Sequence, residues 1–129
     1  WRRSVRWTKG TAFIWLPGLG SDTSYIDLRM HSPDIPSQPG RTLKIMLDEV
    51  DLGEVVLDPF SWETYSFEIP PQWLPRGDRV PRLTLSTTPF RPADEFAGST
   101  DRRQLGIRLD WVRWRSSEID EAHRPNPMP

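Results

Sequence analysis

The chain has 129 residues, 36% of them hydrophobic and 27% charged, which suits one soluble globular domain with a modest core. Its 17 Lys and Arg are balanced by 18 Asp and Glu, so we expect no nucleic-acid partner, because phosphate binding needs a clustered cationic excess. The lack of cysteine excludes disulfides and thiolate chemistry, and no apolar run is long enough for a membrane-spanning helix.

Short apolar runs separated by Gly, Pro and Asp recur along the chain, and this pattern predicts an all-β sandwich. Apolar and polar residues alternate in several runs, as Ile26, Leu28 and Met30 do against Asp27 and Arg29, which indicates half-buried strands. No segment shows the periodicity of an amphipathic helix. In chain order, the predicted strands cover residues 5–8, 12–16, 24–30, 42–47, 54–57, 62–69, 82–87 and 105–115.

Three long connections, at residues 31–40, 70–81 and 89–103, are rich in proline or lack a regular pattern, so they are predicted as loops. Eight short strands with long crossovers favour an eight-stranded jelly-roll sandwich over a meander. Residues 1–115 are therefore predicted to form the β-sandwich domain. Residues 116–129 are predicted to be a Pro-rich C-terminal tail or linker.

Tryptophan is abundant for a chain of this size, and an indole ring can stack on the C–H face of a sugar. Trp15 and Trp111 lie inside apolar strands, so we expect them in the core. Trp62 and Trp73 flank long loops, so we expect them to be partly exposed and to contact a ligand. Trp114 falls on the strand face opposite Trp111. The full set of candidate sugar platforms is Trp7, Trp15, Trp62, Trp73, Trp111 and Trp114.

The longest predicted loop carries a charged rim that suits sugar hydroxyls or an anionic sugar, because Arg offers a planar fork to carboxylates. An alternative is that Asp101, Arg102 and Arg103 form internal ion pairs that fix the loop onto the last strand. Glu95 and Arg102 belong to this rim. The predicted ligand-binding residues are Trp62, Trp73, Arg91, Asp94, Asp101 and Arg103.

Paired carboxylates raise the alternative of a small glycosidase, which needs two acids across a cleft. Each candidate acid lies in a turn or loop, where acids are common, and a sandwich of this size offers a shallow cleft. His31 and His123 form no visible catalytic triad. We therefore expect no catalytic residues. The acids considered are Asp48, Glu49, Asp51, Asp94, Glu95 and Asp101.

Several segments together resemble one family. The most specific are Phe90-Arg91-Pro92, Asp101-Arg102-Arg103-Gln104-Leu105-Gly106 and Leu109-Asp110-Trp111-Val112. Weaker N-terminal segments are Val5-Arg6-Trp7-Thr8, Ile14-Trp15-Leu16-Pro17, Leu43-Lys44-Ile45-Met46-Leu47-Asp48 and Leu52-Gly53. Over roughly residues 4–115 the chain resembles galactose-binding-like β-sandwich domains appended to bacterial multi-spanning membrane glycosyltransferases of the protein-mannosyltransferase type. These domains are similar to carbohydrate-binding modules of the jelly-roll kind.

The resemblance implies a non-catalytic, extracytoplasmic accessory domain that binds a glycan or sugar moiety beside a membrane-attached parent protein. A second interpretation is a structural or assembly module that contacts protein in a larger complex. It is favoured by the many Arg and Trp residues, which are enriched at interface hot spots. A concave polar patch around one tryptophan would favour sugar, and a flat apolar patch would favour protein.

We expect no cofactor from the residues alone, although the resemblance implies a structural calcium ion with Asp110 in the position of a metal ligand. The N-terminal end departs from that pattern, because residues 1–10 contain no Asp or Glu. Calcium usually takes about six to eight oxygen ligands, several of them carboxylates. An ion pair between Asp110 and Arg6 is the alternative for the same place.

Overall fold

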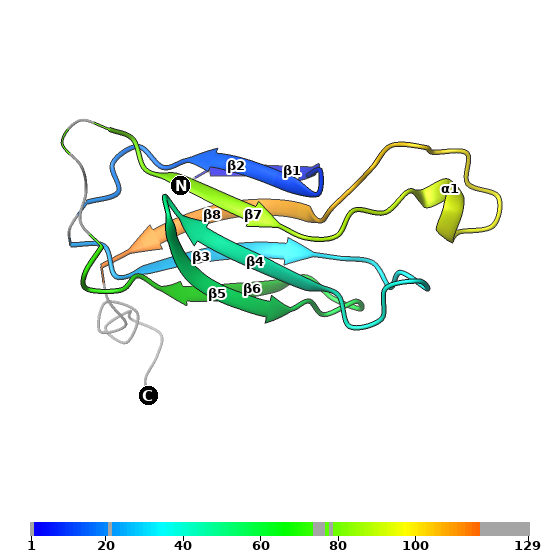
Figure 1. Cartoon of the computed structure of the whole chain (residues 1–129), viewed down its shortest axis with the longest axis horizontal. Coiled ribbons are helices and arrows are strands. Elements are labelled where there is room, and N and C mark those ends of the chain that lie inside the picture. The colour runs from blue at the N-terminus through cyan, green and yellow to red at the C-terminus, as the bar shows by residue number, and fades with distance from the viewer. Residues whose placement is uncertain (1, 21, 74–76, 78, 117–129) are drawn as a thin grey trace.

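Two antiparallel sheets of four strands each lie face to face in the computed structural model (Figure 1). The structure describes residues 2–20, 22–73, 77 and 79–116, with side chains from residue 7 onward. The first sheet comprises, in order, β1 (Arg2–Trp7), β8 (Arg108–Arg115), β3 (Tyr25–His31) and β6 (Glu63–Glu68). The second comprises β2 (Thr11–Trp15), β7 (Arg82–Ser86), β4 (Thr42–Leu47) and β5 (Val50–Val56). The predicted all-β class is confirmed for the described residues, whose only helix is the single turn α1 (Pro92–Glu95).

One face of each sheet contributes to a shared apolar core. Ile26, Leu28 and Met30 of β3 are fully buried, as their alternation with polar residues predicts. Burying a side chain of this size contributes about 1.5–3 kcal/mol, so this core is the main source of stability. Its other members include Leu43, Ile45 and Leu47 of β4, Leu83 and Leu85 of β7, and Phe67 of β6.

Strand β8 contains a bulge, and this overturns the prediction that Trp111 is a core residue. The pairing of β8 with β3 shifts so that Asp110 is an extra residue in β8. Leu109 and Val112 are therefore both buried in the core, and Trp114 packs against it, whereas Trp111 lies on the outer face. Trp111 and Trp114 do lie on opposite faces of β8, as predicted, but Trp114 rather than Trp111 is on the side of the core.

The burial predicted for Trp15 is also wrong. Strand β2 is an edge strand of the second sheet, and its side chains alternate between the core and solvent. Ile14 packs against the core, while Phe13 and Trp15 are each 56% exposed. The whole run is apolar, so its composition could not indicate which face of the strand is buried.

The connections that follow β1, β3, β5 and β7 lie at the end of the molecule where α1 is drawn (Figure 1), which we call the loop end. The connections after β2, β4 and β6 lie at the opposite end, so the predicted loop 70–81 is remote from the predicted loop 89–103. The loop end therefore gathers segments that are far apart in sequence. They are residues 8–10, 32–41, 57–62 and 87–107.

Several predicted boundaries change in the structure. Strand β5 begins at Val50, earlier than the predicted start at residue 54, after a turn in which Asp48 has a positive φ of 51°. The last strand begins later than predicted, since Leu105 forms only an isolated bridge with Phe90. Beyond Ser116, the predicted tail lies outside the described residues. Within the described part of the chain, no helix is long and apolar enough to cross a membrane.

Candidate ligand site at the loop end

Arg41 ties the loop-end segments together, although the residue is only 7% exposed. Its Nη1 donates to Oγ of Ser32 (2.6 Å) and to the carbonyl of Gly106 (2.9 Å), and its Nη2 donates to the carbonyl of Thr88 (2.7 Å). Its Nε donates to Oε1 of Gln38 (3.0 Å). Burial lowers the pKa of this guanidinium, and none of the described carboxylates pairs with it. Arg41 thus fixes loop 32–41 against the long loop before β8.

A small second core lies beneath the same loops. Ile35, Phe90 and Leu105 are buried together, and Trp7 packs against them. The rings of Trp7 and Phe90 meet edge to face, with their centroids 5.7 Å apart. Backbone hydrogen bonds of 2.9 Å and 2.8 Å join Phe90 to Leu105. One side of the Trp7 indole is therefore fixed by packing.

Gly106 allows the segment before β8 to pass close to the turn after β1. Its N–H donates to the carbonyl of Thr8 (2.7 Å), and the N–H of Ile107 donates to Oγ1 of Thr8 (3.0 Å). A Cβ atom at position 106 would collide with the carbonyl of Lys9. The close approach requires glycine and brings Lys9 next to the end of the long loop.

Two adjacent hollows open at the loop end. The loop-end hollow has a volume of about 540 Å³, within the usual range for small-molecule sites. The neighbouring polar hollow has a volume of about 340 Å³. Gln104 lines both. The loop-end hollow is lined by Trp7, Thr8, Lys9, Arg103, Gln104 and Leu105. The polar hollow is lined by Gln38, Pro89, Phe90, Arg91, Asp94, Glu95 and Gln104.

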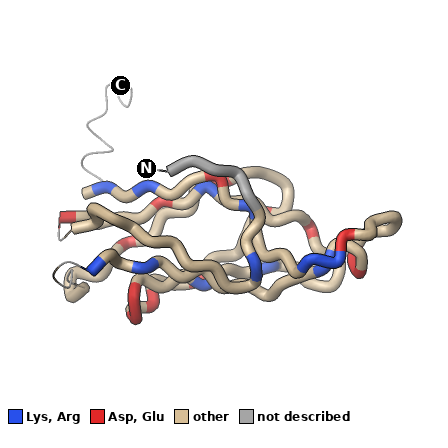
Figure 2. Tube along the Cα trace, turned by 90° about the horizontal axis from the view of Figure 1, so that it is seen from above, with Lys and Arg blue, Asp and Glu red and all other residues tan. Residues whose placement is uncertain are grey.

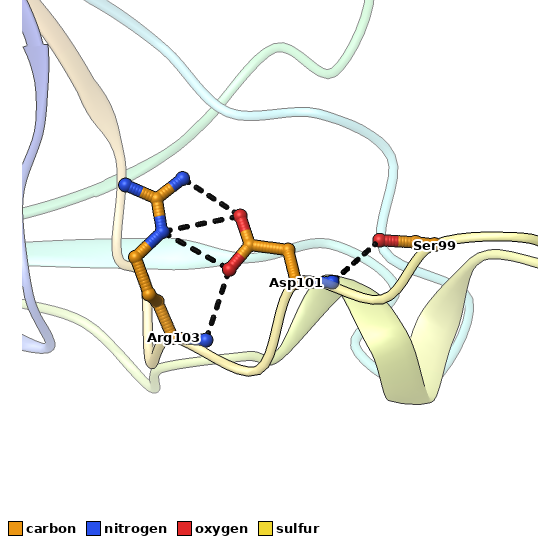
Figure 3. A network of polar contacts seen from close by, with 3 residues as sticks. All are labelled: Ser99, Asp101 and Arg103. Atoms are coloured by element: carbon orange, nitrogen blue, oxygen red, sulfur yellow. Dashed lines mark hydrogen bonds and ion pairs between the residues drawn. The ribbon is translucent and has the colours of Figure 1, made fainter.

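Asp101 and Arg103 form a tight pair (Figure 3), and Arg103 of this pair lines the loop-end hollow. Oδ1 of Asp101 accepts bonds from the backbone N–H and Nε of Arg103, both at 3.0 Å. Oδ2 accepts from Nη2 at 2.7 Å. These bonds lower the pKa of Asp101 to about 2. The predicted internal pairing is therefore present, and it holds the guanidinium in one orientation.

The structure brings five of the six predicted ligand residues, all but Trp73, to the loop end, and four of these five line the two hollows or pair with a residue that does. Arg91 and Asp94 line the polar hollow, Arg103 lines the loop-end hollow, and Asp101 orients Arg103. Basic and acidic positions are interspersed over the described chain (Figure 2), so the local lining decides the charge of each hollow.

Trp73 is a core residue, which corrects the prediction that it is partly exposed and contacts a ligand. It is 8% exposed, belongs to the main core, and donates from Nε1 to Oδ2 of Asp48 (3.1 Å). A sugar ring needs an open indole face, and burial removes it. The neighbouring prolines indicated a loop, but a loop residue can still insert its side chain into the core.

Trp62 is half-buried and lines neither hollow. Its ring centroid lies 5.4 Å from that of His31, and the guanidinium carbons of Arg29 and Arg108 lie 5.6 Å and 5.3 Å from it. Arg108 also lies over Trp7, 5.8 Å from the ring centroid. Burial and then Arg108 lower the pKa of His31, whose buried Nδ1 has no hydrogen-bond partner among the described residues. Trp62 therefore belongs to a cation–aromatic cluster.

An ion network covers part of the outer face of the first sheet. Asp27 is 1% exposed because Arg113 and Arg115 lie over it. Its Oδ2 accepts from Nε of Arg115 (2.9 Å) and Nη2 of Arg113 (3.0 Å). Burial alone would raise the pKa of Asp27, but hydrogen bonds from Arg115, Ser66 and Arg113 outweigh it and lower the pKa.

Asp110, the predicted calcium ligand, accepts a hydrogen bond from Nε of Arg29 (3.1 Å) and is 5% exposed. Among the residues that the structure describes, no group of three or more His, Asp or Glu could hold a metal ion. The described surroundings of Asp110 therefore do not fit calcium. The side chain of Arg6, the other expected partner, lies outside the described ones.

The acids considered for glycosidase chemistry fall into two separate groups. Asp48, Glu49 and Asp51 lie around the turn between β4 and β5, away from the loop end. Asp94 and Glu95 line the polar hollow, where the Glu95 carboxylate accepts bonds from the N–H and Oγ of Ser37 at 3.1 Å and 2.7 Å.

Five residues of the loop-end hollow were absent from the predicted ligand set: Trp7, Thr8, Lys9, Gln104 and Leu105. Trp7 was among the candidate sugar platforms, but nothing in its local sequence indicated a hollow beside it. Lys9 and Gln104 meet only because the turn after β1 packs against the segment before β8. No family model matches this chain, and neither a curated protein nor a solved structure resembles it closely enough to count as a match.

Proposed function

We propose that this chain is a non-catalytic carbohydrate-binding module that takes a sugar in the loop-end hollow. The observation that carries the proposal is a hollow of about 540 Å³ that is lined by Trp7 together with Lys9, Arg103 and Gln104. An apolar wall with a few polar groups is the usual composition of a small-ligand site. The sequence resemblance supports an extracytoplasmic accessory role beside a membrane glycosyltransferase.

The strand order supports a jelly-roll arrangement of the two sheets. β1 pairs with β8, β2 with β7, β3 with β6 and β4 with β5. Such pairing arises when one long antiparallel hairpin is wound into two facing sheets, which is the arrangement of a jelly roll. In this arrangement the loops after alternate strands gather at one end, where variation in sequence can build a ligand site without disturbing the core.

A glycan-array screen, with and without calcium, followed by calorimetry on the best ligand, tests the proposal. Gln104→Ala should raise the Kd about threefold to tenfold, the usual value of one neutral hydrogen bond. Trp7→Phe, which retains an aromatic ring against the second core, should weaken binding by reducing the stacking surface.

Two control variants lie outside the hollow. Arg102→Ala removes a neighbouring exposed cation, and Trp15→Ala removes an exposed indole on β2. Neither should change the Kd. Binding that survives Gln104→Ala and Trp7→Phe but is lost in Trp15→Ala would contradict the proposed location.

A structural or assembly module is the second candidate function, and the outer face of β2 favours it. Phe13 and Trp15 are each 56% exposed there, and Arg82 lies over the Phe13 ring at 4.7 Å. Exposed aromatic residues on an edge strand are typical of contact surfaces. Analytical ultracentrifugation tests this function: self-association that Phe13→Ser with Trp15→Ser abolishes would support it, and a monomer at high concentration would count against it.

A further inference from the structure

Building on the proposed sugar site, we infer that the loop-end hollow selects an acidic sugar of the uronate class. In this assignment Lys9 and Arg103 receive the carboxylate, and the Trp7 indole receives the C–H face of the same ring. The inference concerns the class of ligand, so it can fail while the sugar site itself stands.

The charge of the lining carries the first step. Two cations, Lys9 and Arg103, line the loop-end hollow, and no carboxylate does. Lys9 is exposed, and none of the described acids pairs with it. The nearby acids Asp94 and Glu95 line the polar hollow instead. An anionic group in the loop-end hollow therefore meets Lys9 as a cation without a described acidic partner and Arg103 beside the carboxylate of Asp101, which lies outside the lining.

The orientation of Arg103 carries the second step. Asp101 binds the Nε and Nη2 side of the guanidinium, and Nη1 makes no hydrogen bond to any described residue. Figure 3 shows this remaining nitrogen turned away from Asp101. Because the pair already holds the guanidinium, a ligand carboxylate can accept from Nη1 with little further loss of side-chain entropy.

The apolar wall and the shared glutamine carry the third step. Trp7 and Leu105 give the hollow an apolar side that a free inorganic anion would not use. A uronate ring presents a C–H face and a carboxylate on one unit, so it matches both sides. Gln104 also lines the polar hollow, where Arg91 and Asp94 suit the hydroxyls of a second sugar unit. The ligand is thus an oligosaccharide with an acidic unit.

Matched ligand pairs test the inference. Tetramers of galacturonate, glucuronate and mannuronate are titrated by calorimetry beside their methyl esters, which retain the ring and lose the charge. At least one acid form should bind about tenfold or more tightly than its ester, and the difference should shrink with added salt. Poly-glutamate, which carries carboxylates without sugar rings, should not compete.

Variants test whether residues of the loop-end hollow cause the preference for the acid form. Lys9→Gln and Arg103→Gln should each reduce the preference for the acid form while leaving ester binding nearly unchanged. Arg102→Gln removes the same charge at an adjacent exposed position outside the hollow, so it should leave the preference intact. A fall in preference as large in Arg102→Gln as in Lys9→Gln would overturn the inference, because it would indicate net charge rather than this hollow.

The failure of the inference and the failure of the proposed function give different results. Esters that bind as tightly as acids, with both weakened by Gln104→Ala, would overturn the uronate class and retain the sugar site. Full competition by poly-glutamate would also overturn the uronate class. Binding of no glycan, acidic or neutral, on the array or by calorimetry would overturn both proposals.

Discussion

Replacing Arg41 with methionine tests whether one buried guanidinium fixes the loop end. Methionine retains a long unbranched side chain and removes every hydrogen-bond donor. Two of the lost bonds run to buried acceptors, Oγ of Ser32 and the carbonyl of Gly106. The other two, to Gln38 and Thr88, are partly buried, so water can replace them.

The expected change in the free energy of unfolding follows from these contacts. A hydrogen bond from a charged donor contributes about 1.5–3 kcal/mol, so the two buried bonds contribute roughly 3–6 kcal/mol. Removing a buried charge that has no carboxylate partner among the described residues relieves a desolvation penalty, which offsets part of this loss. We expect Arg41→Met to lower the free energy of unfolding by about 2–4 kcal/mol.

Urea unfolding at a constant m-value measures this free energy, and amide exchange at Thr8, Phe90 and Gly106 reports the local loosening. Arg82→Met is the matched control, because Arg82 lies over Phe13 on an outer face and should cost about 0.5–1 kcal/mol. Arg41→Met as stable as Arg82→Met, with unchanged exchange at the loop end, would refute the reasoning.

Three further predictions concern other sites. Gly106→Ala should destabilise the fold by about 1–3 kcal/mol, because its Cβ collides with the Lys9 backbone; unchanged urea midpoint and amide shifts at Lys9 would contradict this close approach. Trp73→Ala should cost about 3–5 kcal/mol in urea unfolding, as expected for a core residue, and a loss below about 1 kcal/mol would contradict its burial. Asp27→Asn should cost roughly 2–4 kcal/mol at pH 7. Because the folded pKa of Asp27 lies below 3.8, wild type should lose this advantage as pH falls from about 4 through the folded pKa, and a gap that stays constant down to pH 2 would refute the assignment.

The strands with one apolar and one polar face were predictable from sequence. Residues 42–47 form β4 with the predicted bounds, and β3 buries Ile26, Leu28 and Met30 as predicted. In these strands the hydrophobic effect acts on a period-two pattern, so local sequence fixes which face is buried.

The bulge in β8 and the exposure of β2 were not predictable in the same way. An extra residue at Asp110 changes which side chains face the core after it, and no local pattern announces it. At Trp15, apolar residues occupy both faces of an edge strand, so burial depends on the neighbouring sheet rather than on the strand's own sequence.

The candidate site was predictable only in part, for a related reason. The charged residues of the long loop were identifiable because they cluster in sequence. Their partners, Trp7 and Lys9, lie about ninety residues away, and they reach the hollow through hydrogen bonds between Thr8 and the segment at Gly106 and Ile107. Pairing at such separation depends on the whole strand order, which local propensity does not contain.

The desolvation penalty of the buried Arg41 guanidinium also bears on function. A structural loop can be closed by apolar packing, and the second core around Phe90 already supplies some of it. A buried guanidinium that donates to Ser32, Thr88 and Gly106 adds directional bonds but carries a desolvation penalty. Directional bonds of this kind are expected where a site needs fixed geometry. Arg41 joins loop 32–41 to the segments at Thr88 and Gly106, so its bonds support the proposal that the loop end is held rigid for a ligand.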